Sequence, residues 1–363
     1  MPAPALFLKI SHFPIRTYVR SRTLVLALLA GAVLATQLFA QANGDKRPLT
    51  IADYQLWRTI SGSRISADGR WAAWGYSRER SDDVVYIKSL DGTTEHVLSP
   101  ATGVQLSGDG QWAAYFVDPP FAEAEKLRRD GEDVSRDAEL MNLASGEKLT
   151  WGDVTTFEFA EGSSHFFVKK RQPNEDSDHD GTDLILRNLE EGYEELIGSV
   201  DEAEFNEAGT LFAYSVDAAD RDGNGLYYVN LGTGSRRALD NAKQRYTELT
   251  WSEDGRGIAV LRGEIPEKKT ERANALIAFV GMDEESPQGH VFDPSENQGL
   301  REGSVISEKD GLMWSEDLGT IFVGTKAQQD ELEDWPEDGL PLADVNIWHW
   351  ADDRIQAAQQ RQA

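Results

Sequence analysis

The chain has 363 residues, of which 27% are charged and 40% hydrophobic, enough for one large domain or two ordinary ones. Its 63 acidic residues outnumber its 36 basic ones, for a formal net charge of -27, and nucleic acid and anionic membrane surfaces repel so acidic a protein. Because the chain has no cysteine, disulfides, thiol nucleophiles and zinc or iron–sulfur sites built on thiolates are excluded.

The pattern of residues 1–42 predicts an export signal. They contain no acidic residue, and their four basic residues (Lys9, Arg16, Arg20 and Arg22) all precede an apolar run over 24–39 that leads to Ala40-Gln41-Ala42, an A-x-A cleavage pattern. The run is shorter than the roughly 20 residues that span a bilayer, so an uncleaved membrane anchor is the weaker alternative. We therefore expect cleavage after Ala42, a periplasmic or secreted location, and no membrane attachment after cleavage.

From residue 43 onward, one pattern recurs six times. An apolar or aromatic residue leads into a short polar turn that ends in Gly, and a strand of large residues follows, as in Ile65-Ser66-Ala67-Asp68-Gly69 before Trp71. The turn glycines are Gly69, Gly110, Gly162, Gly209, Gly255 and Gly319. Asp-Gly supplies the positive backbone angles of a tight hairpin. Repeats of about 40–50 residues with short strands are typical of a β-propeller.

A second hairpin follows the turn in several repeats. Residues 84–87 lead to 96–98, residues 183–186 to 195–197, and residues 226–229 to 237–239. One such sheet cannot bury both of its faces, so the sheets must stack. We expect an all-β fold over 43–363, a β-propeller of about six to seven four-stranded blades.

Two stretches interrupt the repeats, and both are predicted to be loops that project from the propeller. Residues 119–139 are charged and partly helix-like, and residues 263–303 combine a Lys/Glu-rich run with a Gly/Pro/Asn-rich run. Residues 344–350 are predicted to form another outer strand, and a Gln-rich segment follows over 356–363. We expect the propeller to be incomplete at the C-terminus.

The sequence predicts no catalytic serine. A serine hydrolase is expected to show G-x-S-x-G. The two G-x-S starts, Gly75-Tyr76-Ser77 and Gly162-Ser163-Ser164, lack the second Gly. His165 follows Ser164, but neighbours on one strand point to opposite faces, so we expect no dyad.

The strongest metal candidate is the acidic segment Asp176–Asp183. Its D-x-D-x-D-G spacing resembles a calcium loop, but Arg187 stands at the twelfth position, where such a loop has Glu. A solvated acidic turn is the favoured interpretation, with calcium left open, and Asp220–Gly225 is predicted to be a hairpin turn. The histidines lack H-x-x-x-H or H-E-x-x-H spacing, and neither G-x-G-x-x-G nor a P-loop opens a helix. Apart from the calcium alternative at Asp176–Asp183, we therefore expect no catalytic, metal, cofactor or nucleotide site.

Four segments carry a resemblance to a known family: 66–74, 181–189, 249–255 and 342–350. Together they resemble the amino-terminal propeller of exported bacterial peptidases of the prolyl-oligopeptidase family, over residues 46–363, although TolB-like and other propellers share the turn motifs. In that family the propeller precedes a C-terminal α/β-hydrolase domain with a Ser-Asp-His triad, and restricts which peptides reach it. No residue of that triad has a counterpart in this sequence.

The resemblance implies the substrate-gating propeller portion of a secreted or periplasmic serine peptidase, inactive alone. The implied partners are peptides and the hydrolase domain that is normally fused C-terminally. The alternative is a freestanding propeller that binds a protein or an envelope component.

Overall fold

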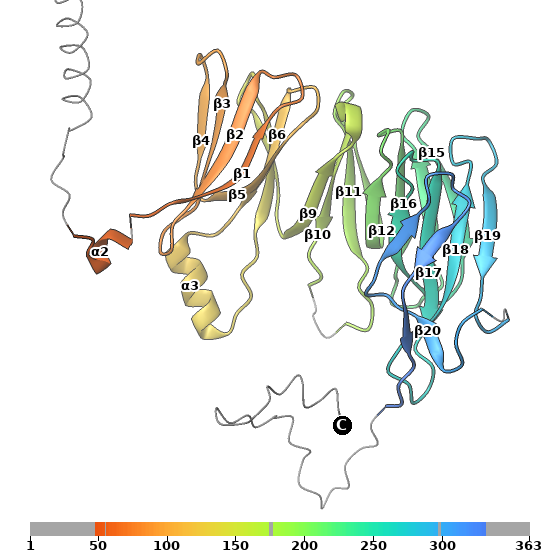
Figure 1. Ribbon diagram of the computed structural model, residues 1–363. Helices are drawn as coiled ribbons and strands as arrows, with labels where there is room; N and C mark the ends of the chain where they lie inside the picture. The colour runs from red at the N-terminus through yellow and green to blue at the C-terminus, as the bar shows by residue number, and fades with distance from the viewer. Residues whose placement is uncertain (1–47, 55, 174–176, 297–298, 332–363) are drawn as a thin grey trace, which may run out of the picture. The chain divides into compact units, whose positions relative to one another are not determined.

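The computed structural model describes residues 48–331, apart from 55, 174–176 and 297–298. The chain divides into two units, residues 1–57 and 58–363. The described part of the first unit contains one short helix, α2 (Ile51–Tyr54) (Figure 1). No helix among the described residues is long and apolar enough to cross a membrane. The predicted signal over 1–42 and the predicted strand over 344–350 lie outside the described residues.

The second unit is built almost entirely of antiparallel strands that pair in chain order. The first sheet contains β1 (Thr59–Ile65), β2 (Trp71–Ser77), β3 (Val84–Ser89) and β4 (Glu95–Leu98). The second contains β5 (Ala101–Leu106), β6 (Trp112–Val117), β7 (Asp137–Asn142) and β8 (Lys148–Trp151). The fifth contains β16 (Arg245–Trp251), β17 (Gly257–Glu264), β18 (Ala273–Val280) and β19 (Gln288–Phe292).

The third and fourth sheets share a strand. They contain β9 (Val154–Phe159), β10 (His165–Lys170), β11 (Thr182–Asn188), β12 (Glu194–Phe205), β13 (Leu211–Val216), β14 (Gly225–Asn230) and β15 (Ser235–Asn241). The first half of β12 pairs with β11 and its second half with β13, across a register shift between Val200 and Ala203. The shift lets one 12-residue strand close the third sheet and open the fourth.

The described part of the sixth sheet is a hairpin. β20 (Ser304–Ile306) pairs with β23 (Thr325–Ala327), and β21 (Leu312–Trp314) pairs with β22 (Ile321–Val323). The interruption at 119–139 contains a ten-residue helix, α3 (Phe121–Asp130), which ends at Gly131 in the left-handed conformation. The prediction of a loop over 263–303 is wrong, because β18 and β19 lie there. The apolar residues of β18 alternate between the two faces of the fifth sheet, and this pattern was hidden by the charged and Gly-rich residues around it.

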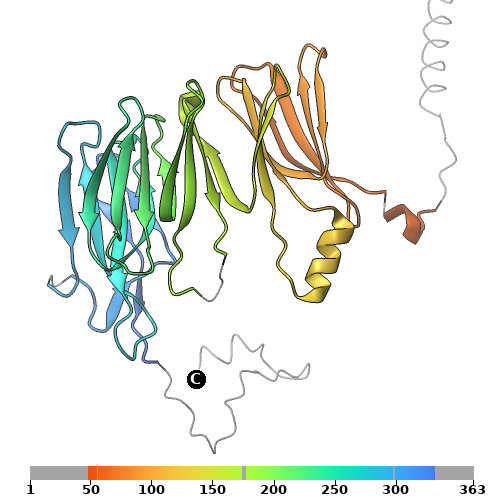
Figure 2. The same cartoon turned by 180° about the vertical axis from the view of Figure 1, so that it is seen from behind.

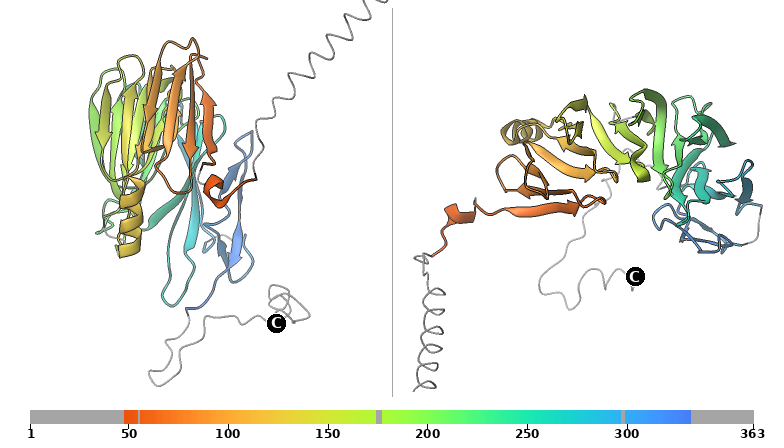
Figure 3. Two further views of the ribbon diagram at one scale, coloured as in Figure 1. Left: turned by 90° about the vertical axis from the view of Figure 1, so that its left-hand side faces the viewer. Right: turned by 90° about the horizontal axis from the view of Figure 1, so that it is seen from above.

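Each pair of neighbouring sheets encloses its own hydrophobic core. Val85 and Ile87 of the first sheet pack with Met141 and Leu143 of the second, and four further clusters repeat this arrangement up to the sixth sheet. Figures 2 and 3 show the successive sheets of the second unit lying face to face. This is the blade arrangement of a β-propeller, as the sequence predicted. Among the described residues, the first and sixth sheets neither pair nor share a core cluster.

The recurring turn has one geometry wherever it contains Ser-x-Asp. The Ser66 hydroxyl donates to Asp68 Oδ1 (2.6 Å) and accepts the Trp71 N–H (2.9 Å), and Ser107 and Ser252 bond in the same way. The Ser66 and Arg70 hydrogen bonds lower the pKa of Asp68 to about 2. The side chain thus fixes the turn that starts the second strand of each of these sheets.

Candidate functional site

A cavity of about 500 Å³ lies where β9, β10, β12 and β16 come together. We call it the first-strand cavity, because β9, the second half of β12 and β16 are the first strands of the third, fourth and fifth sheets. Its charged lining residues are Lys169, Asp201, Glu202, Glu204 and Glu248. We call the four carboxylates, together with Glu158 of β9 beside Glu204, the acidic wall, to which three successive sheets contribute.

The glutamates at this wall are easier to protonate than ordinary surface glutamates. Burial raises the pKa of Glu202 to about 7. Burial, together with the nearby Glu204 carboxylate, raises the pKa of Glu158 to about 7. Burial also raises the pKa of Glu204 and of Glu248, with a further contribution to Glu248 from Glu308. Such a wall attracts cationic groups and exchanges protons near neutral pH.

Beside the cavity, three aspartates surround one arginine. The carboxylate oxygens of Asp180, Asp201 and Asp217 lie within 4.8 Å of one another, a spacing that could hold a metal ion. Arg245 occupies this position: it pairs with Asp180, with Asp201 (3.0 Å) and with Asp217 (3.9 Å). The guanidinium therefore supplies the positive charge that the three carboxylates require.

The acidic segment Asp176–Asp183, for which a solvated turn was favoured and calcium left open, contacts the Arg245 cluster through Asp180. Asp180 turns toward Arg245, and its backbone N–H donates to Asp217 Oδ2 (2.9 Å). Asp183 is exposed on β11, and Asp176 lies outside the described residues. The predicted turn over 220–225 also contacts the Arg245 cluster. The buried side-chain amide of Asn224 donates to Asp217 Oδ1 (3.1 Å).

Ser164 and His165 are in contact, so the premise that their side chains point to opposite faces of one strand is wrong. Ser164 follows the short helix η1 (Glu161–Ser163) and precedes β10, so strand alternation does not apply to it. Its Oγ lies 3.0 Å from His165 Nδ1, and Asn188 Nδ2 lies 3.4 Å from His165 Nε2.

In this contact His165 is the donor and Ser164 the acceptor, the reverse of a catalytic dyad. Asn188 Oδ1 accepts the N–H groups of Glu190 and Glu191, so its amide nitrogen faces His165 and donates to Nε2. Neutral His165 then carries its proton on Nδ1 and donates to Ser164, whereas a general base must accept the serine proton. Burial lowers the pKa of His165, which favours this neutral form.

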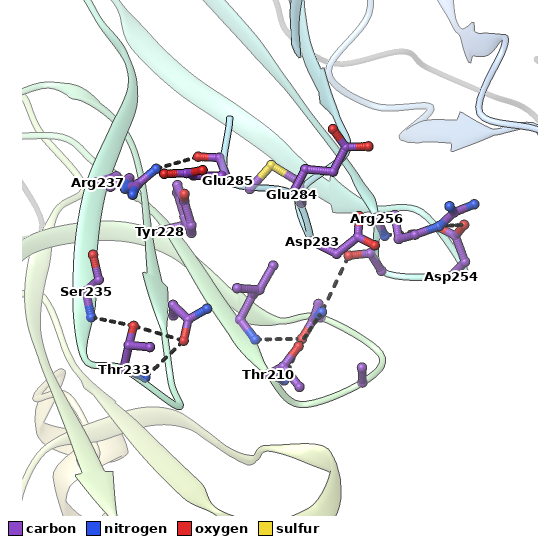
Figure 4. Close-up of a pocket in the computed structure, with 16 residues that line it drawn as sticks. Thr210, Tyr228, Thr233, Ser235, Arg237, Asp254, Arg256, Asp283, Glu284 and Glu285 are labelled. Carbon is purple, nitrogen blue, oxygen red and sulfur yellow. Dashed lines mark hydrogen bonds and ion pairs between the residues drawn. The ribbon is translucent and has the colours of Figure 1, made fainter. Parts of the chain in front are cut away.

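A second cavity of about 620 Å³ lies between the turns of the fourth and fifth sheets (Figure 4). Its polar side chains bond to one another and to the backbone. Arg237 donates to the Glu285 carbonyl (2.7 Å), and Arg256 pairs with Asp254 (2.7 Å). Asn206 accepts the N–H groups of Thr210 and Leu211. The Arg237 bond joins the fourth and fifth sheets, and the other bonds fix the two turns that border the cavity.

Sequence reasoning missed both the acidic wall and the Arg245 cluster. One local signal was present: Glu158 and Glu204 each stand two residues before the start of a turn, at Ala160 and Asn206. The other members come from separate strands, and only the stacking of sheets brings them together.

No family model and no curated protein matches the sequence. The similar solved structures include the β-propeller domain of the Trilobed protease from Pyrococcus furiosus (12% identity, 76% of this chain, 84% of that chain, TM-score 0.38). Acylaminoacyl peptidase from Pyrococcus horikoshii is also similar (12% identity, 77% of this chain, 46% of that chain, TM-score 0.36). So is prolyl oligopeptidase B from Galerina marginata (14% identity, 72% of this chain, 40% of that chain, TM-score 0.39). The chain spans less than half of the length of the last two. Peptidases with propeller domains are thus among its structural neighbours, at low identity.

Proposed function

We propose that this chain is the substrate-gating propeller portion of a secreted or periplasmic serine peptidase, whose peptide hydrolysis belongs to a C-terminal α/β-hydrolase domain. The observation that carries the proposal is the succession of stacked sheets, each with a polar turn that ends in Gly before its second strand, in a chain whose segments resemble the propeller of that peptidase family. The export pattern of residues 1–42 supports the location.

In this proposal, selection of peptides takes place at the first-strand cavity. Glu202, Glu204 and Glu248 give it an excess of carboxylates over Lys169. A wall of this charge attracts peptides with Lys or Arg side chains and repels acidic peptides. Charge complementarity of this kind acts mainly on association, so the preference weakens as salt rises.

Two measurements on the purified chain test the proposal. A serine-reactive fluorophosphonate should label no residue, Ser164 included, and labelling would show a nucleophile of the chain's own. At low salt, a basic peptide should bind more tightly than an acidic peptide of equal length. Glu204→Gln should reduce the difference between the two affinities. The matched control, exposed Glu190→Gln, should leave that difference unchanged. Equal binding of both peptides would overturn the assignment to the acidic wall.

A freestanding propeller that binds a protein or an envelope component is the second candidate. The outward face of the first sheet favours it, because Ile60 and Val97 are exposed there beside the stacked rings of Trp74 and Tyr86. Reading the coding DNA past codon 363 distinguishes between the two candidate functions. A frame that continues into G-x-S-x-G and later Asp and His supports the peptidase, and a stop with no hydrolase downstream supports the binding propeller.

A further inference from the structure

Glu158 and Glu204 occupy equivalent positions in neighbouring sheets. Glu158 of β9 stands two residues before Ala160, where the turn of the third sheet begins, and Glu204 of β12 stands two residues before Asn206, where the turn of the fourth begins. Because the sheets stack face to face, equivalent positions of neighbouring first strands lie side by side (Figure 3). The Glu204 carboxylate accordingly opposes the ionisation of Glu158.

Within the described part of the chain, neither of these carboxylates has a cation or a hydrogen-bond donor to balance its charge. Both side chains are half-buried, and neither an opposite charge nor a hydrogen bond contributes to the pKa of either group. The ammonium of Lys169, which lines the same cavity, donates instead to the Asp201 carbonyl (2.5 Å). When both glutamates are ionised, the pair therefore holds an unmatched negative charge that burial makes costly.

The charged groups on the neighbouring strands leave this pair as the place for an incoming cation. Glu202 accepts two backbone N–H groups of β16. Asp201 binds Arg245 (3.0 Å). Glu248 adds a further negative charge from the fifth sheet, and on the opposite side Gln105 of β5 is neutral. The surroundings therefore attract a cation without supplying one to the pair.

A cationic group between the two carboxylates removes the cost of ionising both. An ammonium or guanidinium within about 4–6 Å favours the charged form of a carboxylate, and a guanidinium also offers several N–H donors in one plane. We propose that Glu158 and Glu204 share one proton in the empty protein and release it to the solvent when they bind one ammonium or guanidinium group of a basic peptide. This inference rests on the proposed function, which assigns basic peptides to the first-strand cavity, and adds that their binding is coupled to proton release.

This coupling makes the affinity for basic peptides depend on pH. In the empty protein the pKa of Glu158 is about 7, and a bound cation lowers it. At pH 6 most of the empty protein must lose a proton before it binds the cation, whereas at pH 8 most of it has already done so. The affinity should therefore rise on the order of tenfold between pH 6 and pH 8 at constant ionic strength.

Two capped peptides test this coupling in the full chain. One contains a single arginine and has an acetylated N-terminus and an amidated C-terminus, so its own charge is constant between pH 6 and pH 8. The other has citrulline, which is neutral and of similar shape, in place of the arginine. The arginine peptide should bind on the order of tenfold more tightly at pH 8 than at pH 6, and the citrulline peptide should bind weakly and equally at both.

Calorimetry measures the proton itself. At pH 7, titrations of the arginine peptide in two buffers of different ionisation enthalpy should show the release of about half a proton per peptide bound, because about half of the empty protein then holds the proton. The peptide pair and the calorimetry use the unsubstituted chain, so neither depends on the folding of a variant.

One substitution assigns the effect to the pair. Glu158→Gln removes the group that holds the proton near pH 7, so it should reduce the change in affinity to less than about threefold. Exposed Glu190→Gln is the matched control and should keep the change on the order of tenfold.

The outcomes separate this inference from the proposed function. An arginine peptide that binds more tightly than the citrulline peptide by the same factor at pH 6 and pH 8, with no proton released, would overturn the inference and leave the proposed function standing. An unchanged pH effect in Glu158→Gln would also overturn the inference. Equal binding of the two peptides at both pH values would overturn the proposed function and this inference with it.

Discussion

Glu202 shows how a single carboxylate connects two blades. A register shift between Thr247 and Thr250 interrupts the pairing of β16 with β17, and Glu248 there has a positive φ of 61°. Such a bulge removes backbone N–H groups from the ladder. The Glu202 carboxylate, from β12, accepts the N–H groups of Glu248 (3.1 Å) and Leu249 (2.7 Å). A buried side chain of one sheet thus satisfies the irregular backbone of the next.

Glu202→Ala should destabilise the fold by about 1–3 kcal/mol, because it leaves two part-buried N–H groups without this acceptor. Urea unfolding at pH 7 measures the loss as a lower free energy of unfolding. Exposed Glu190→Ala is the matched control and should change stability by less than about 0.5 kcal/mol. A similar small effect in both variants would show that water replaces the carboxylate.

At the scale of the element, the Ser-x-Asp-Gly turn is a self-contained unit. Ser107 is fully buried, donates to Asp109 Oδ1 (2.6 Å) and accepts the Trp112 N–H (2.9 Å). Gly110 has a φ of 65°, and a Cβ there would collide with the Asp68 carboxylate of the preceding turn. The spacing of residues in this turn therefore follows both from local bonds and from the contact between neighbouring blades.

Ser107→Ala should lower the free energy of unfolding by about 1–3 kcal/mol, since the Trp112 N–H loses its side-chain acceptor in a buried place. Chemical denaturation measures the effect. Ser145→Ala, in an exposed turn of the same sheet, is the control and should have a smaller effect. If both substitutions cost the same, the turn hydroxyl contributes no more than an ordinary surface group.

The blades could be predicted from the sequence because their signals are local. Ser66, Asp68 and Gly69 bond within a few residues of one another, so their spacing in the sequence is also their spacing in the turn. The Arg245 cluster could not be predicted, because Asp180, Asp201 and Asp217 come from different segments and meet only after the sheets stack. The contact of Ser164 with His165 was not predicted for a related reason, since the boundary between η1 and β10 decides where the Ser164 hydroxyl points.

At the scale of the whole molecule, a small group of carboxylates lies where burial resists ionisation. Burial raises the pKa of Glu158 and of Glu202 to about 7, from an ordinary value of 4.5. Burial also raises the pKa of Glu204, Glu248 and Asp201, the last despite Arg245 and Lys169 beside it. Folding therefore costs free energy whenever these groups must carry charge.

The folded protein should lose stability as pH rises from about 4.5 to about 7. In that range the unfolded chain has already released the protons of Glu158 and Glu202, while the folded protein still binds them, so the unfolding free energy falls with pH. The two groups should together account for about 2–4 kcal/mol, at about 1.4 kcal/mol per pKa unit and discounted for partial exposure. Below pH 4 the trend reverses, because the unfolded chain then takes up a proton at Asp68, whereas the folded protein, in which the pKa of Asp68 is about 2, does not.

Urea denaturation at pH 5, 6, 7 and 8 measures this slope. Glu158→Gln should make the unfolding free energy fall less steeply with pH, because an amide does not titrate and only Glu202 of the two groups remains. Exposed Glu190→Gln should leave the pH dependence unchanged. A stability that rises from pH 5 to pH 7 in the unsubstituted chain would mean that the glutamates of the acidic wall ionise as freely in the folded protein as in water. The wall would then have to be hydrated rather than buried between the first strands of the sheets.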